Sequence, residues 1–393
     1  MTPAARVQAA IELLDAVIEA AKAGGAPADR LVTDYFRQRR YAGSKDRRAV
    51  RELLYDAIRA CGPVPASGRA AMLLLAESNP AISALFDGST HGPERMGGGE
   101  QPAAGGIAPH WLVGELARSG LDDAEQIALL DRAPLDLRVN TLKAGREIIA
   151  LPVAAEPTAA PHGLRIASGA PVEQWDAFRD GLVEVQDTGS QLACHAVAAA
   201  PGETIVDLCA GAGGKTLALA AAMDNRGTLI ASDTDRARLQ KLAPRTERAG
   251  AGMIEARLLN PGREMEALGD LAGTADAVLV DAPCSGTGTW RRNPEARWRL
   301  TTERLERFLA AQDHVLDLAA KLVKPGGRLI FVTCSLLDAE GAGRVEAFLA
   351  RHSGWNTDAI DLPLGRARGK GLRLTPFHDG TDGFFIARLS RAC

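Results

Sequence analysis

Two cysteines fifty positions apart are the residues of this chain best suited to chemistry. Cys284 lies in the segment Asp-Ala-Pro-Cys-Ser-Gly-Thr-Gly at 281–288, and Cys334 lies in Val-Thr-Cys-Ser at 332–335. Each cysteine follows a short apolar run that is typical of a buried parallel strand. Because the carboxyl ends of neighbouring parallel strands form the floor of a ligand crevice, both thiols could face one substrate. The pattern favours a shared reactive site over packing, which is the commoner fate of cysteine.

A glycine-rich loop, Asp-Leu-Cys-Ala-Gly-Ala-Gly-Gly-Lys-Thr at 207–216, follows another strand-like run. Its small residues allow a tight turn and bring backbone amides to a ligand at the start of the next helix. The end of the loop matches the end of a P-loop, and Asp281 could serve such a site by binding magnesium. A P-loop requires glycine at position 209, where the side chain of Cys209 would crowd a phosphate. An NTPase is therefore disfavoured.

Asp233 ends the next apolar run, at 229–233. A carboxylate at this position can accept both hydroxyls of a ribose, which suits S-adenosylmethionine as well as a dinucleotide. The three-glycine spacing of a dinucleotide site is not reproduced. The alternative is structural, because Asp233 or Asp235 could cap the following helix.

The reactive residues require a sheet of parallel strands to position them. Strand-like runs alternate with helical segments from residue 204 onward, which is typical of βαβ units in a doubly wound domain. The segment Lys-Pro-Gly-Gly at 324–327 should break the helix before the fourth strand. The predicted strands of this domain are 205–208, 229–233, 276–281, 328–333 and 382–389.

The first part of the chain is predicted to be helical, from residue 2 to about 86. Ser44 could cap a helix over 45–59, whose buried stripe would contain Val50, Leu53, Leu54, Ala57 and Ile58. Around this helix lies a basic cluster, which could be a solvated helix face or a phosphate-binding surface. The members of the cluster are Arg37, Arg39, Arg40, Lys45, Arg47, Arg48 and Arg51.

Residues 87–107 are too rich in glycine and proline for regular structure and predict a linker. A short helical stretch at 111–130 and two strands, at 137–142 and 163–166, predict a small mixed α/β element beyond it.

Composition limits the class of protein. A chain of 393 residues is longer than one hydrophobic core usually organises, so several domains are expected. The net charge of -3 means that any nucleic-acid-binding surface must be local. Six scattered cysteines favour neither a disulfide framework nor a zinc site and indicate a reducing compartment. The first helix is amphipathic and no long apolar run exists, so a soluble cytoplasmic protein is expected.

Six motifs give nearly the whole chain a specific resemblance to the RsmB/Sun family of S-adenosylmethionine-dependent RNA cytosine-5 methyltransferases. The motifs occur at 138–143, 185–191, 207–216, 281–286, 333–335 and 382–385. The N-terminal helices, with the segment at 41–48, resemble the NusB-like RNA-binding module of RsmB. The resemblance implies a helical NusB-like RNA-binding domain, a linker, a small α/β RNA-binding element and a Rossmann-like class I methyltransferase domain, at 1–86, 87–107, 108–183 and 184–393.

The resemblance also implies roles for the reactive residues. Cys334 would attack C6 of a cytosine, which makes C5 nucleophilic enough to accept a methyl group. Cys284 would assist breakdown of the covalent adduct, Asp281 would hydrogen-bond the base near N3, and Lys215 would act at the same site. The rival assignment makes Cys284 the nucleophile, as in DNA cytosine methyltransferases, which share the Pro-Cys motif. Those enzymes lack the Thr-Cys-Ser partner, so Cys334 favours the first assignment.

S-adenosylmethionine is the cofactor that the resemblance implies. The family usually has Pro at Ala212 and an Asp after the third strand, where this chain has Asn260. The amide oxygen of Asn260 could accept the same hydrogen bond from the adenine amino group. The implied cofactor site consists of Cys209, Ala210, Gly211, Ala212, Gly213, Gly214, Lys215, Asp233, Asn260 and Asp281.

The expected partner is RNA, by resemblance ribosomal RNA, with no metal, no membrane and a monomeric state. The segment 291–298 follows the Cys284 loop, so its arginines are predicted to grip RNA phosphates, with Trp298 available to pack or to stack. The alternative is a solvated start of a helix. A non-catalytic RNA-binding or ribosome-assembly factor is the alternative, since a fold alone does not establish chemistry. Against it stand the intact Cys334, Cys284, Asp281 and Lys215. A second basic patch contains Arg366, Arg368, Lys370 and Arg373.

Overall fold

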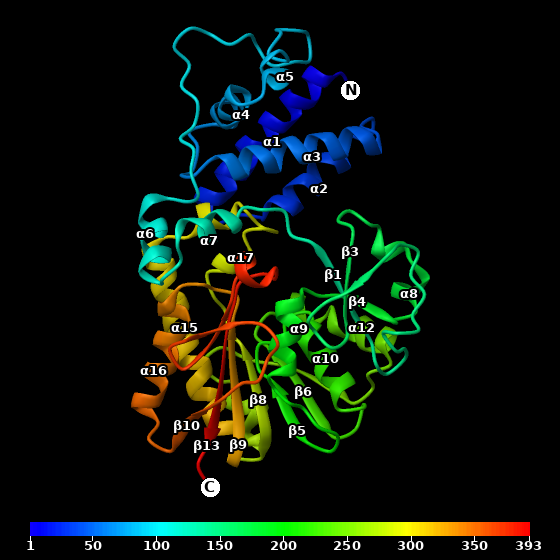
Figure 1. Ribbon diagram of the computed structural model, residues 1–393, viewed down its shortest axis with the longest axis vertical. Helices are drawn as coiled ribbons and strands as arrows, with labels where there is room; N and C mark the ends of the chain where they lie inside the picture. The colour runs from blue at the N-terminus through cyan, green and yellow to red at the C-terminus, as the bar shows by residue number, and fades with distance from the viewer. The chain divides into compact units, whose positions relative to one another are not determined.

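The computed structural model describes residues 1–393, which divide into two compact units (Figure 1). The helical unit contains Met1–Asp131 together with Thr289–Thr302, and the sheet unit contains Arg132–Gly288 together with Glu303–Cys393. Residues 108–131, which the sequence placed in the small α/β element, belong instead to the helical unit. None of the helices combines the length and apolar character that crossing a bilayer requires.

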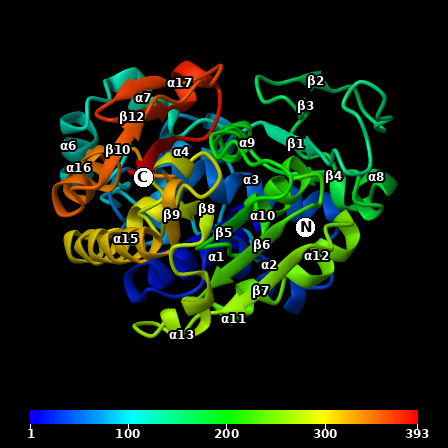
Figure 2. The ribbon, with the colours of Figure 1, turned by 90° about the horizontal axis from the view of Figure 1, so that it is seen from below.

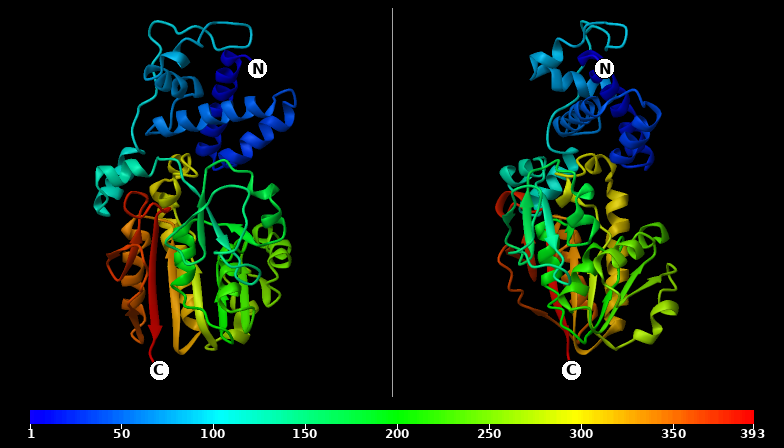
Figure 3. Two further views of the ribbon diagram at one scale, coloured as in Figure 1. Left: turned by 45° about the vertical axis from the view of Figure 1, so that its right-hand side comes forward. Right: turned by 90° about the vertical axis from the view of Figure 1, so that its right-hand side faces the viewer.

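The helical unit begins with α1, whose apolar stripe is buried as its amphipathic pattern predicts. Helix α3 presents Val50, Leu54, Ala57 and Ile58 to the same core, but it is capped by Gly43, and Ser44 is its first residue. Residues 87–107 form a long irregular connection (Figure 3). The helices are α1 Pro3–Ala23, α2 Ala28–Gln38, α3 Ser44–Ala60, α4 Gly68–Glu77, α5 Pro80–Ser83, α6 His110–Arg118 and α7 Asp123–Ala128.

The segment Thr289–Thr302 contains the short helix α14 (Ala296–Arg299), which packs into the helical unit. The Arg297 side chain is fully buried there and donates to the carbonyls of Ile58 and Cys61 at 2.6 and 2.7 Å, near the C-terminus of α3. The indole of Trp298 donates to the carbonyl of Gly62. A guanidinium at a helix C-terminus satisfies carbonyls that have no partner within the helix. The prediction that Arg297 grips RNA phosphates is therefore wrong, and of the two roles open to Trp298 the structure shows packing.

The sheet unit is built on a nine-stranded sheet. Its central strands β7, β6, β5, β8 and β9 are parallel and adjacent in that order, while β13 pairs antiparallel with β9, as Figure 3 shows. The predicted doubly wound core is therefore present, with an antiparallel edge. The strands are β5 Thr204–Asp207, β6 Thr228–Asp233, β7 Ile254–Leu258, β8 Ala275–Asp281, β9 Val323–Thr333, β10 Trp355–Asp358, β11 Arg366–Arg368, β12 Gly371–Leu374 and β13 Phe384–Arg391.

Helices cover both faces of this sheet, because alternate residues of its buried strands point to opposite sides. Val278 and Val280 of β8 pack with α15 and α16, while Ala277 and Leu279 pack with α9 and α10. Figure 2 shows α15 on one side of the strands and α9 and α10 on the other. The helices of this unit are α8 Asp176–Arg179, α9 Thr188–His195, α10 Gly214–Ala222, α11 Arg236–Leu239, α12 Leu242–Ala249, α13 Met265–Leu268, α15 Thr302–Leu322, α16 Ala342–Arg351 and α17 Pro376–Asp379.

Residues 324–327 do not form a turn between helix and strand. Helix α15 ends at Leu322, and β9 begins at the next residue, with a register shift opposite Ala275 and Ala277 of β8. The glycines are accommodated as an irregularity of the strand. A separate four-stranded sheet, in the order β2, β3, β1, β4, contains both strands predicted for the small element. Its strands are β1 Leu135–Val139, β2 Glu156–Pro157, β3 Gly163–Ile166 and β4 Val183–Val185.

Candidate active site

The two cysteines meet at the carboxyl edge of the sheet. Strands β8 and β9 are parallel neighbours, with Asp281 in register with Val332, so the segments that follow them emerge side by side. The Gly288 amide donates to the carbonyl of Cys334 at 2.9 Å and joins the two loops. The sulfur atoms of Cys284 and Cys334 lie 3.4 Å apart, and both side chains are partly accessible. The structure thus brings together the two thiols that sequence spacing had paired.

The thiols differ in their electrostatic surroundings. The contact with Cys334, burial, and the negative charges of a Cys334 thiolate and of Glu340 all raise the pKa of Cys284 well above its usual value. Cys284 therefore retains its proton and can donate it toward the sulfur of Cys334. This arrangement keeps Cys284 a neutral thiol, which is a poor nucleophile.

A lysine and a carboxylate lie at the same edge. The Lys215 ammonium, on the first turn of α10, donates to Asp281 Oδ2 at 2.7 Å. Burial alone would lower the pKa of Lys215, but the negative charge of Asp281 outweighs it and holds that pKa above its usual value. Lys215 also lies 5.7 Å from the ring centroid of Phe384. The pair places a fixed positive charge and a hydrogen-bonding carboxylate beside the thiols.

The glycine loop fits the backbone site expected for a nucleoside cofactor. Gly211 and Gly213 have positive φ angles of 57° and 85°, and a Cβ on Gly213 would come within 2.1 Å of Leu242. No side chain caps the N-terminus of α10, so its first amides remain available to a ligand. The loop therefore requires glycine where it turns and keeps donors where a ligand would bind.

Asp233 lies next to this loop and is nearly buried. Its carboxylate accepts the amides of Gly211 and Asp235, each at 2.7 Å, so it serves both the loop and the start of the following helix. The helix cap at α11 is Asp235. Asn260 follows β7 at the same edge of the sheet, and its side chain is exposed. The amide of the preceding residue, Leu259, donates to the Asp233 carbonyl. Asp233 and Asn260 are thus neighbours, as a shared nucleoside site requires.

Asp207 lies beneath the loop and is fully buried. Burial, with the negative charges of Asp281 and Asp233, raises the pKa of its carboxyl to about 7, although the Thr216 hydroxyl donates to it at 2.6 Å. The folded protein thus retains a proton that the unfolded chain releases near pH 4. Asp207 therefore lowers the free energy of unfolding as pH rises from about 4 to about 7.

We expect Asp207→Asn to remove this pH dependence. Relative to the native protein, the variant should gain more than about 1 kcal/mol of unfolding free energy between pH 5 and pH 8. Urea denaturation at both pH values measures the change, with the exposed Asp361→Asn as control. An equal difference between variant and native protein at the two pH values would contradict the assignment.

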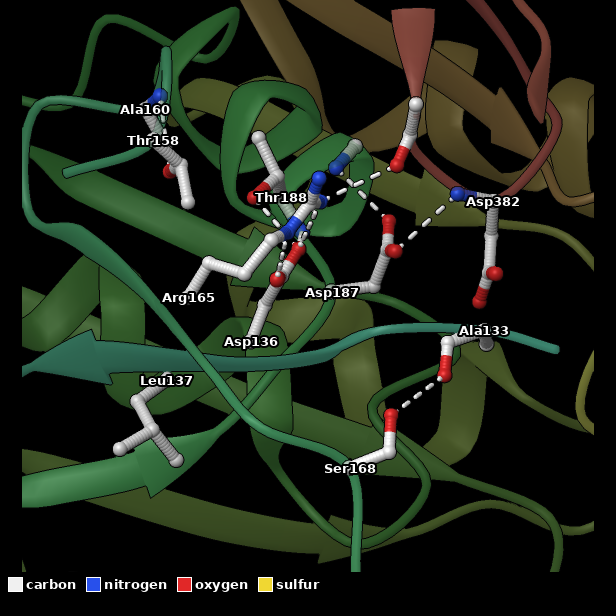
Figure 4. A network of polar contacts seen from close by, with 12 residues as sticks. Ala133, Asp136, Leu137, Thr158, Ala160, Arg165, Ser168, Asp187, Thr188 and Asp382 are labelled. Carbon is white, nitrogen blue, oxygen red and sulfur yellow. Dashed lines mark hydrogen bonds and ion pairs between the residues drawn. The ribbon is translucent and has the colours of Figure 1, made fainter. Parts of the chain in front are cut away.

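A network of polar contacts holds two of the sequence motifs together (Figure 4). Asp136 of β1 accepts two hydrogen bonds from Arg165 of β3 and two from Thr188, the first residue of α9. The neighbouring Asp187 caps α9 and accepts the amide of Asp382, just before β13. The motifs at 185–191 and 382–385 drew attention to two of the segments in this network. The sequence offered no reason to assign roles to Asp136 and Arg165.

The other predicted cysteines and basic residues are placed as follows. Cys61 and Cys194 are buried, and burial raises the pKa of each to about 11, as expected for packed thiols.

In the second basic patch, Arg368 and Arg373 both form ion pairs with Asp338. In the cluster around α3, four cations are exposed and have no ion-pair partner, namely Arg40, Lys45, Arg48 and Arg51.

Comparison with known proteins places this site in a family. Residues 194–390 match the family described as 16S rRNA methyltransferase RsmB/F. Over 304 residues the chain is 36% identical to the probable ribosomal RNA small subunit methyltransferase B of Synechocystis sp., covering 72% of this chain and 67% of that protein. Ribosomal RNA small subunit methyltransferase B of Xylella fastidiosa is 35% identical over 292 residues, covering 72% and 66% respectively.

Solved structures share the fold of this chain. The crystal structure of PH0851 covers 98% of this chain and 99% of its own, with a TM-score of 0.77 and 25% identity. NSun6 from Pyrococcus horikoshii with SFG has the same fold, with a TM-score of 0.61 and 21% identity over 68% of this chain and 93% of its own. With the family match and its relatives, the methyltransferase fold and its ordered motifs establish that this chain belongs to the RsmB/F family of rRNA methyltransferases.

Proposed function

We propose that this protein transfers a methyl group from S-adenosylmethionine to C5 of a cytosine in RNA of the small ribosomal subunit. The observation that carries the proposal is the pair of thiols 3.4 Å apart, beside the Lys215 and Asp281 ion pair. The names of the relatives support ribosomal RNA as the substrate. A methyl donor and a nucleophilic thiol are together what a C5 methyl transfer to cytosine requires.

The glycine loop and Asp233 would hold S-adenosylmethionine. Amides at the start of α10 would bind its methionine part, Asp233 its ribose, and Asn260 its adenine amino group. When bound, this cofactor supplies an electrophilic methyl group on a sulfonium. Lys215 would remain paired with Asp281 and keep that carboxylate oriented for the base.

Cys334 would begin the reaction by forming a bond from its sulfur to C6 of the cytosine. The C5–C6 π electrons then move into the ring. Asp281 is hydrogen-bonded to the base near N3, and the positive charge of its partner Lys215 stabilises the negative charge that develops on the ring. C5 next forms a bond to the methyl carbon, and the methyl–sulfonium bond breaks with its electron pair left on sulfur. Loss of the C5 proton and cleavage of the bond between Cys334 and C6 restore the double bond and the thiolate.

Cys284 is placed to accept the C5 proton in the last step. Before attack, the contact with Cys334 is the largest cause of its raised pKa. Once the Cys334 sulfur is bonded to carbon, that contact no longer opposes ionisation, and the pKa of Cys284 falls. Cys284 would then lose its own proton to solvent and, as a thiolate, accept the C5 proton when the adduct breaks down.

In the helical unit, the exposed cations of the basic cluster around α3 would contact RNA. Arg40, Lys45, Arg48 and Arg51 could neutralise phosphates, since no acidic side chain pairs with them. The net charge of -3 makes such a local cluster necessary for binding RNA.

Two measurements test the proposed function. Mapping 5-methylcytosine across total RNA, in cells with and without the gene, should reveal one or a few ribosomal positions that lose the modification. Calorimetry should detect binding of S-adenosylmethionine and none of ATP with magnesium. Unchanged 5-methylcytosine, together with RNA binding, would favour the non-catalytic alternative.

A further inference from the structure

Both reactive cysteines are followed by a serine, and the two serine hydroxyls bind the same buried carboxylate. The Ser335 hydroxyl donates to Glu340 Oε2 at 2.6 Å, and the Ser285 hydroxyl donates to the same oxygen. Glu340 lies in the short turn before α16 and is fully buried. The family resemblance assigned no role to Glu340, and its position six residues after Cys334 does not by itself suggest one.

Every hydrogen bond that the Glu340 carboxylate accepts comes from the two loops that carry the thiols or from a residue that holds one of these loops. Oε1 accepts the backbone amide of Ser285 at 2.8 Å and the side-chain amide of Gln312 at 3.1 Å. Gln312, on α15, also donates to the carbonyl of Pro283, which directly precedes Cys284. The Glu340 carboxylate therefore accepts four hydrogen bonds, three from residues adjacent to the cysteines and one from a residue that holds the same loop.

A second set of bonds extends this arrangement. The Ser335 hydroxyl donates to Glu340, so Thr287 must be the donor in its 3.1 Å contact with Ser335. Thr287 in turn accepts the amide of Leu336 at 2.8 Å. Both loops are thus joined through one buried acid, and buried polar groups that are fully bonded fix a single geometry.

We propose that Glu340 is a positioning residue that holds the Cys284 and Cys334 loops together, so that both thiols meet one base. The inference deepens the proposed function and rests on it. Displacing reacting atoms by about 1 Å can cost about a hundredfold in rate, so a crosslink that sets the separation of two sulfurs should control turnover.

The negative charge of Glu340 also acts on the thiols. Together with the contact to Cys334 and burial, this charge raises the pKa of Cys284 and keeps its proton in place before attack. Two charged groups act on the pair: Glu340 before α16 acts on Cys284, and Lys215 on α10 interacts with Cys334. Glu340 therefore helps to keep Cys284 in its neutral form.

Two substitutions separate the crosslink from the charge. Glu340→Ala removes all four hydrogen bonds and should lower kcat by about tenfold to a hundredfold, with little change in the Kd of S-adenosylmethionine. Glu340→Gln should restore most of kcat, because its amide can accept from Ser285 and Gln312 and donate to the hydroxyls. It should also make Cys284 react with iodoacetamide at lower pH, as mass spectrometry of the labelled peptides would record.

A readout that needs no activity tests the separation of the sulfurs directly. Phenylarsine oxide bridges two thiols that lie close together, so it should bind the native protein, bind Glu340→Ala at least about tenfold more weakly, and not bind Cys334→Ala. The matched control is Glu346→Ala on α16, an exposed glutamate, which should change nothing. Ser335→Ala removes one of the hydrogen bonds to Glu340. This variant is used in the same measurements if Glu340→Ala does not fold.

The outcomes are distinct for the two proposals. Native arsenical binding and native kcat in Glu340→Ala would overturn the positioning role. A parallel loss of cofactor affinity and kcat would also overturn it, because it would indicate general collapse of the site. If the native protein methylates no cytosine, the proposed function fails, while the arsenical still reports whether Glu340 sets the distance between the thiols.

Discussion

Cys334→Ala is expected to lower methyl transfer at least about 10⁴-fold, because the remaining thiol, Cys284, has a raised pKa and keeps its proton, so it does not replace Cys334 as the nucleophile. Cys284→Ala is expected to leave the protein covalently attached to RNA, because the base that releases the adduct is missing. The 3.4 Å separation of the sulfurs supports both expectations, since either thiol can reach the same ring. Denaturing gels of protein incubated with labelled RNA and cofactor would detect the adduct.

Cys393→Ala provides the matched control, because this thiol is exposed and lies in the last residue of the chain. The control should turn over normally and form no lasting adduct. If Cys334→Ala still transfers methyl groups while Cys284→Ala does not, the roles of the two thiols must be exchanged. Accumulation of adduct in Cys334→Ala would have the same meaning.

Gly213→Ala is expected to weaken S-adenosylmethionine binding by at least about tenfold. The residue has a φ of 85°, which strains any residue with a Cβ, and an added Cβ would lie 2.1 Å from a methyl carbon of Leu242, so the loop or that side chain must shift. Calorimetric titration of the folded variant measures the loss, and circular dichroism establishes that the sheet unit is intact.

Gly202→Ala separates backbone strain from the loop itself. Gly202 has a similar φ of 90°, lies before β5 at the other end of that strand, and has open space where a Cβ would be added. This control should lose some stability and retain its affinity for the cofactor. Equal Kd values for Gly213→Ala and the native protein would remove the loop from the cofactor site.

Several features of the fold could be predicted because they depend on local pattern. Apolar runs between helical segments placed β5, β6 and β8 to within one residue at each end, since buried parallel strands are continuously apolar. The carboxyl end of β9 was also placed correctly, but this strand begins five residues earlier than predicted. The final strand was also found, two residues out of place at each end. The prediction failed at 324–327, where proline and glycine were read as a break but occupy an irregular stretch of β9.

Other features depend on partners that are distant in the sequence. Arg297 was predicted to contact RNA because its neighbours are basic and close to Cys284, yet three of its four acceptors are carbonyls more than two hundred residues away. Asp136 and Arg165 belong to two strands whose pairing no short window reveals. A carboxylate such as Glu340 has no sequence signal, because its importance comes from four donors that only the folded chain assembles.

The sequence by itself determined the two thiols, the glycine loop and the family. Residue type and position relative to a strand end are local properties, and parallel strands place their carboxyl ends along one edge. The tertiary structure decided the 3.4 Å contact, the raised pKa of Cys284 and the shared carboxylate beneath both loops. These depend on distance and burial, which are set by how β8, β9, α15 and the turn before α16 pack together.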